Sequence, residues 1–183
     1  QSGGGYWCYT DGSCNDSSTT QLVMAGLAAA RTVYADRNNG DQNRLNTLNN
    51  STARTRSAYK NGGRNGGLGN GEKGHGYRSN SDPSYQQTAS GLWCQIIGGS
   101  DIRDNGVQSY FRWLYNRYSY ERISAAPNSW NQAYYYYLWS SAKAYTFLED
   151  AGIEPNGGGL HPRDLGLVGP NNAPAFGDRQ RHL

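Results

Sequence analysis

Three segments of this chain repeat one pattern, and that pattern constrains the fold more than any other feature of the sequence. Each segment has Gly or Asn near its start, continues with an aromatic residue and a polar turn, and ends in an apolar run rich in small residues. The segments span residues 4–31, 74–99 and 127–145. Because Ser, Thr or Gln stands where each apolar run begins, the pattern predicts a helical repeat.

Hydrophobic spacing predicts five helices in an all-α chain. Residues 17–35, 82–99 and 129–150 form the apolar helices of the repeat, and 17–35 is apolar on nearly every face, which is typical of a buried helix. Residues 43–60 and 104–123 carry their apolar residues along one stripe, which is typical of an outer layer. The order is therefore inner, outer, inner, outer, inner.

Helix-end signals and glycines divide the chain further. We expect Asp82 to cap the helix that Pro83 begins, and Gly152 to end the last helix. Residues 61–76 are rich in glycine but lack the GxxxxGK[ST] phosphate loop, so they are predicted to form a flexible surface loop. We expect a helical domain over residues 1–152 and an extended, loop-like Gly/Pro-rich tail over 153–183.

The segment GGGYWCYTDGSCNDSSTTQLVMAGLAAAR (residues 3–31) resembles the repeat of the terpenoid cyclase / protein prenyltransferase superfamily, also called the prenyltransferase/squalene oxidase repeat. The resemblance extends over about residues 3–152. It implies an (α/α) toroid of concentric helical hairpins, of which this chain supplies about two and a half repeats. A toroid that is only partly present requires completion by further residues or by another chain.

The catalytic motifs of the resembling families are missing. The chain has no D-x-D-D motif, which squalene cyclases use to protonate substrate, and no G-C-G-E-Q thioester motif. Protein prenyltransferases bind zinc through Asp, Cys and His, but the spacing of Asp11, Cys14, His75 and His161 does not match. We therefore expect no metal and no cofactor.

Toroidal polysaccharide lyases offer another comparison, because they combine Asn, His, Tyr and Arg to neutralise a uronate and abstract its α-proton. The chain is rich in Tyr, Asn and Arg, and its histidines are His75, His161 and His182. All three histidines fall in predicted loops or in the tail. We therefore interpret them as surface residues.

The net charge of the chain and its cysteines indicate which classes of partner and which cellular compartment are compatible with the sequence. The net charge is +3 and the basic residues are scattered, which argues against nucleic-acid binding. No apolar run is long enough to cross a membrane. Cys8 and Cys14 flank a turn and are predicted to form a disulfide, with Cys94 left over in a helix. This pattern favours an extracellular or cell-surface protein, with the periplasm as another compartment of the same kind.

The run of four tyrosines, Tyr134–Tyr137, lies within the helix predicted at 129–150. Successive helical residues turn by about 100°, so the four rings cannot face one pocket, and most of the run is predicted to be core. The single polar stripe of this helix carries the candidate ligand-binding residues, Tyr136, Ser140 and Lys143.

These observations favour a non-catalytic toroid-repeat domain of a secreted or surface protein that serves binding or assembly. Its partner would be a protein, either the rest of the toroid or a neighbouring subunit, or a glycan. The alternative is a fragment of an (α/α)-toroid enzyme, cyclase-like or polysaccharide lyase, whose catalytic residues lie mostly outside this chain.

Overall fold

The computed structural model describes residues 1–10, 14–67, 71–117 and 130–150, and helices dominate this part of the chain. Five helices and one short antiparallel strand pair follow one another, which confirms the all-α class. Their bounds are α1 Ser17–Tyr34, α2 Gln42–Gly62, β1 Arg64–Asn65, β2 Lys73–Gly74, α3 Tyr85–Ile97, α4 Asn105–Asn116 and α5 Trp130–Asp150.

Local signals start the helices close to the predicted positions. The carboxylates of Asp16 and Asp41 accept backbone N–H bonds from the first turns of α1 and α2. The predicted cap of α3 is wrong: Ser84 is the N-cap, and Asp82 instead pairs with Arg64 at 2.6 Å. Helix α4 ends at Asn116, earlier than the predicted residue 123.

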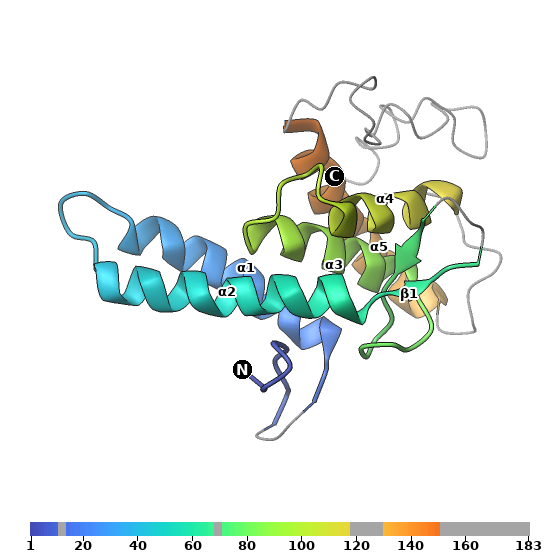
Figure 1. Ribbon diagram of the computed structural model, residues 1–183, viewed down its shortest axis with the longest axis horizontal. Coiled ribbons are helices and arrows are strands. Elements are labelled where there is room, and N and C mark those ends of the chain that lie inside the picture. Colours follow the sequence, from blue (N-terminus) through green and yellow to red (C-terminus); the bar gives the residue numbers. More distant parts are fainter. Residues whose placement is uncertain (11–13, 68–70, 118–129, 151–183) are drawn as a thin grey trace.

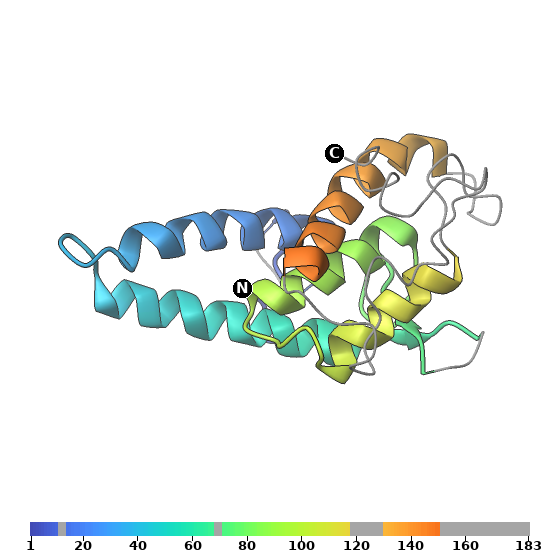
Figure 2. The ribbon, with the colours of Figure 1, turned by 90° about the horizontal axis from the view of Figure 1, so that it is seen from above.

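Helix α3 occupies the centre of the molecule. It packs against α1, α2, α4 and α5, and nearly all of its residues are buried. Figure 2 shows α5 on one side of α3 and α4 with α2 on the other. The small residues predicted for an inner helix explain this close packing: Gly91 lies between the rings of Tyr59 and Tyr110, where a Cβ would approach both within 3 Å.

Helices α1 and α2 form an antiparallel hairpin that extends away from the cluster of α3, α4 and α5 (Figure 1). The prediction that α1 is buried nearly all round is wrong for this reason. Only Ser17, Thr20, Gln21 and Met24, all in its first half, are buried. The stripe predicted for α2 is confirmed in its second half, where Thr52, Thr55 and Tyr59 are buried.

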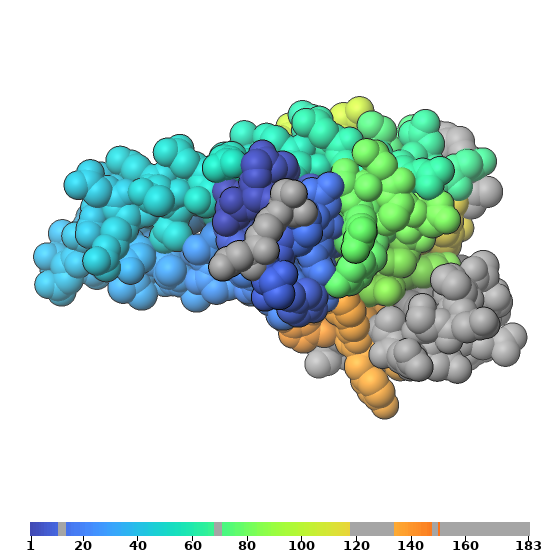
Figure 3. Space-filling view, turned by 90° about the horizontal axis from the view of Figure 1, so that it is seen from below, coloured from blue at the N-terminus to red at the C-terminus, as the bar shows by residue number. Residues whose placement is uncertain are grey.

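The N-terminal segment lies over the junction between the hairpin and the rest of the chain (Figure 3). The predicted Cys8–Cys14 disulfide is present in this segment, and Cys94 is a free, buried thiol in α3. The predicted tail, its boundary with the helical domain and the helix end at Gly152 lie outside the described residues.

Candidate functional site

The three residues of the polar stripe predicted on α5 differ in burial. Ser140 is fully buried, whereas Tyr136 and Lys143 are half-buried. The Lys143 ammonium lies 3.3 Å from the centre of the Trp139 ring, and burial lowers the pKa of Lys143. Ser140 therefore belongs to the interior of the protein, whereas the Lys143 side chain reaches the surface.

Ser140 belongs to a buried polar network that joins three helices. Its Oγ lies 2.8 Å from Ser90 Oγ and accepts a hydrogen bond of 3.1 Å from Trp93 Nε1, both on α3. The Ser90 hydroxyl in turn donates to Gln21 Oε1 on α1 at 2.6 Å. The helices that the sequence assigns to the inner layer, α1, α3 and α5, thus meet at these side chains.

We expect Ser140→Ala to lower the free energy of unfolding by about 1–3 kcal/mol, because it leaves the buried Trp93 N–H without an acceptor. Urea unfolding followed by circular dichroism measures this cost. Ser57→Ala is the matched control, since within the described residues the exposed Ser57 hydroxyl bonds only to Ala53 O, and it should change stability by less than about 0.5 kcal/mol. Equal costs for the two variants would contradict the network.

Tyr134–Tyr137 face different directions, as helical geometry requires, and they differ in burial. Tyr137 is fully buried, and Tyr134 and Tyr136 are half-buried. Burial raises the pKa of Tyr136. Tyr135 is 79% exposed and lies outside the core.

His75 is fully buried, which overturns its interpretation as a surface residue. It follows β2 directly, and its ring lies among the rings of Tyr6, Tyr59 and Tyr110. His75 Nδ1 is 2.7 Å from Gly76 O, a group that only accepts, so Nδ1 carries the proton. His75 Nε2 is then an acceptor, and the single proton of the Tyr6 hydroxyl is shared between this nitrogen at 2.8 Å and Ala58 O at 2.9 Å.

This Tyr6–His75 pair is electrically neutral at physiological pH. Burial lowers the pKa of His75 to about 4. Burial also raises the pKa of Tyr6 above its ordinary range. Since neither group titrates near neutrality, the pair fits a structural role better than proton transfer.

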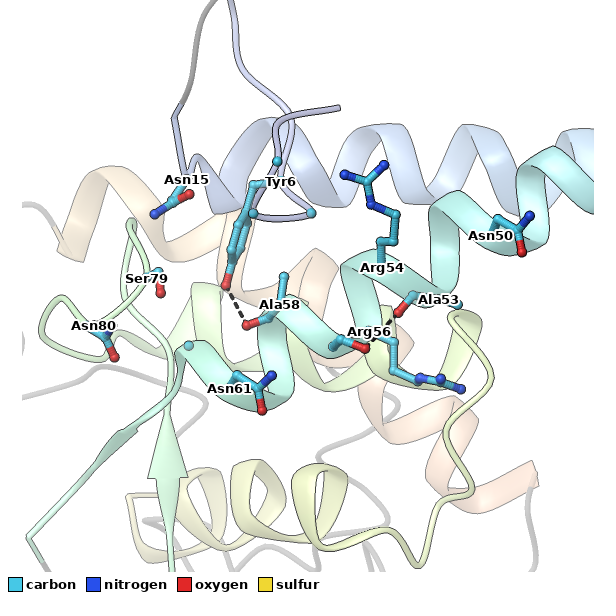
Figure 4. Close-up of a pocket in the computed structure, with 15 residues that line it drawn as sticks. Tyr6, Asn15, Asn50, Ala53, Arg54, Arg56, Ala58, Asn61, Ser79 and Asn80 are labelled. Atoms are coloured by element: carbon cyan, nitrogen blue, oxygen red, sulfur yellow. Dashed lines mark hydrogen bonds between the residues drawn. The ribbon is translucent and has the colours of Figure 1, made fainter.

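A surface groove lies directly above this pair, with a volume of about 800 Å³. One face of α2 forms its floor, residues 3–6 form a wall, and Ser79 with Asn80 closes one end (Figure 4). Gly62 stands at that end, where a Cβ would lie 2.6 Å from the Tyr6 hydroxyl and 2.8 Å from Ser79 Oγ. The missing side chain keeps the deep end of the groove open.

The glycine-rich stretch is packed rather than loose, which corrects the prediction of a flexible surface loop in its described parts. Glu72 is buried and forms a two-point ion pair with Arg117, with N–O distances of 2.8 and 2.9 Å. Arg117 also donates to Gly66 O and lies over the Trp113 ring. The pair ties this stretch to the end of α4.

Sequence reasoning missed both the groove and the buried histidine. One signal was present: His75 is flanked by two glycines, and glycine permits close backbone approach. A Cβ at Gly74 would lie 2.6 Å from Pro83 and 2.7 Å from Trp113 Nε1. The glycines around His75 therefore serve packing.

The described residues were compared with the requirements of a metal site and of a membrane-spanning helix. Among them, no three His, Cys, Asp or Glu side chains gather in a way that would hold a metal ion, and Cys14 is occupied by its disulfide. None of the described helices is both long and apolar enough to cross a membrane.

Comparison of the chain with known protein families, with curated proteins and with solved structures found no match.

Proposed function

We propose that this chain is a non-catalytic helical-repeat domain of a secreted or surface protein, and that it acts in assembly through the outer face of α1. This face, called the α1 outer face below, comprises Leu22, Gly26, Ala29 and Val33. Their spacing of four, three and four residues places them on one side of the helix. Leu22 is 56% and Val33 65% exposed.

The orientation of α1 carries the proposal. Arg31 is the only charged residue of this helix, and it turns inward, donating to Ile97 O at 2.9 Å and to Thr52 Oγ1 at 3.1 Å. The α1 outer face carries no polar side chain. A helix that directs its cation inward and its apolar residues outward has a face suited to another protein surface.

The chemistry of the α1 outer face favours another helix as the occupant. Gly26 and Ala29 lie between Leu22 and Val33, and small residues allow two helix backbones to approach closely. In a partial (α/α) toroid a terminal inner helix lacks its next neighbour, so the resemblance to toroid repeats and this uncovered face support each other. The Cys8–Cys14 disulfide supports an oxidising compartment.

A second copy of the chain offers the same face, so we expect the purified chain to self-associate through α1. The double variant Leu22→Glu/Val33→Glu should weaken self-association at least tenfold, since each lost apolar side chain contributes about 1.5–3 kcal/mol. Analytical ultracentrifugation over a concentration series measures the dissociation constant.

The matched control is Asn43→Glu/Thr47→Glu, which adds the same charge to exposed positions of α2 in the same hairpin. It should leave self-association unchanged. Circular dichroism should show equal helix content for all three proteins. A chain that stays monomeric at every concentration, or an equal loss in both double variants, would contradict the assembly role.

A further inference from the structure

The floor of the groove described above is a continuous polar stripe of α2. Asn50, Arg54, Ser57 and Asn61 follow at intervals of four, three and four residues, so they share one face of the helix. Between Asn50 and Asn61 this face extends over about 16 Å. The groove is therefore elongated and suits a chain-like ligand better than a single small molecule.

The polar groups that line the groove have unused hydrogen-bonding capacity. The amides of Asn15, Asn50, Asn61 and Asn80 line it and make no hydrogen bond within the described part of the chain. Each amide offers two donors and an acceptor. Sugar hydroxyl groups, which also donate and accept, match such amides.

The groove also holds an uncompensated positive charge. Its lining contains no Asp or Glu, and among the described residues no carboxylate forms an ion pair with Arg54. Arg54 extends from α2 toward the N-terminal segment, where its guanidinium makes one contact of 3.3 Å with Ser2 O (Figure 4). Arg56 extends to the opposite side and reaches Gly99 O at 3.4 Å.

We propose that this groove binds an acidic oligosaccharide, a sugar chain that carries carboxylate groups. The amides hydrogen-bond the sugar hydroxyls, and the Arg54 guanidinium binds a carboxylate through two parallel N–H bonds. An isoprenoid chain would need predominantly apolar walls, whereas this lining is about as polar as it is apolar. A nucleic acid would need more cations along its backbone. The site is independent of the α1 outer face.

Isothermal titration of the 183-residue chain, produced in a host that does not glycosylate it, tests the proposal. Three ligands of similar length are compared: an oligogalacturonate, a neutral malto-oligosaccharide and a polyglutamate peptide. We expect the oligogalacturonate to bind at least about tenfold more tightly than the other two, because only this ligand combines hydroxyls with carboxylates. Equal binding of polyglutamate would reduce the groove to a site for negative charge and would overturn the proposal.

Two variants locate the binding in the groove. Arg54→Gln removes the positive charge from the groove. Asn61→Asp adds one negative charge to the floor of the groove, so both variants change the net charge by the same amount. Each should weaken oligogalacturonate binding about tenfold. Asn61→Asp should weaken binding of the neutral ligand less than that of the oligogalacturonate, because the lost amide donors affect both ligands but only the oligogalacturonate carries charges that the new carboxylate repels.

The matched controls are Asn43→Asp on the exposed surface of α2 and Arg37→Gln beyond the end of α1, both outside the groove. They change the net charge by the same amounts and should leave binding unchanged. Absence of binding by the unaltered chain, or losses as large in the controls, would overturn the site. Self-association through α1 is measured separately, so failure of one proposal does not affect the other.

Discussion

Arg117→Gln is expected to lower the free energy of unfolding by about 3–5 kcal/mol, because it removes the Arg117 charge from the buried carboxylate of Glu72. The Glu72 side chain is 1% exposed, and that of Arg117 is 19% exposed. Asn116 donates a further hydrogen bond to Glu72 Oε2, but a neutral amide cannot replace the charge. Chemical denaturation at neutral pH measures the loss.

The partners of this ion pair are not equivalent. Glu72→Gln leaves Arg117 unpaired, but the guanidinium has access to solvent and keeps its bond to Gly66 O. We therefore expect a smaller cost of about 1–3 kcal/mol. The double variant Glu72→Gln/Arg117→Gln should be more stable than Arg117→Gln alone, since no charge remains buried.

Acidification provides a second readout of the same interaction. In Arg117→Gln the buried Glu72 carboxylate loses the Arg117 guanidinium, so its pKa should rise and protonation should relieve part of the cost as the pH falls. Arg64→Gln is the matched control: its partner Asp82 is exposed, so the change should be within about 0.5 kcal/mol. An equal cost for Arg64→Gln and Arg117→Gln would contradict the importance of burial.

The second large effect is a loss of stability in acid through His75. The pKa of His75 is about 4 in the folded chain, against about 6.5 for an unfolded histidine. Between these values the unfolded state binds a proton that the folded state does not, so stability falls as pH decreases from about 6.5 to about 4. At about 1.4 kcal/mol per pH unit, the loss amounts to about 3 kcal/mol.

His75→Gln tests this origin, because glutamine has no ionisable group. The variant should be less stable at neutral pH, since it disturbs the bonds to Tyr6 and Gly76, but its stability should depend less on pH between about 4 and 6.5. His161 and His182 remain in both proteins, so their titration cancels in the comparison. Identical slopes of unfolding free energy against pH would show that His75 is not the source.

The helices could be predicted because their signals are local. The spacing of apolar residues and the small residues of α3 both operate within a few turns of one helix. The disulfide was equally local, since Cys8 and Cys14 are separated by one short turn. The cap of α3 was placed two residues too early because Asp82 bonds to Arg64, a partner on another segment.

The partial burial of α1 could not be predicted, because an apolar helix surface does not show which of its sides other segments of the chain will cover. The same limit explains Ser140 and His75. A serine on a polar stripe suggests exposure, yet Ser140 contacts Ser90 and Trp93, which are 50 and 47 residues away in the chain. Such partners are known only when the helices are placed side by side.

The sequence by itself determined the all-α class, the five helices of the described residues and the Cys8–Cys14 disulfide, because short-range hydrogen bonds and side-chain periodicity specify these features. Only the tertiary structure decided that His75 is buried and neutral, that α1 turns its apolar side outward, and that Asn15, Arg54 and Asn61 line one groove. Each of these three features depends on contacts between residues that are distant in the chain. Which side chains are buried is known only when the segments that cover them are placed in space.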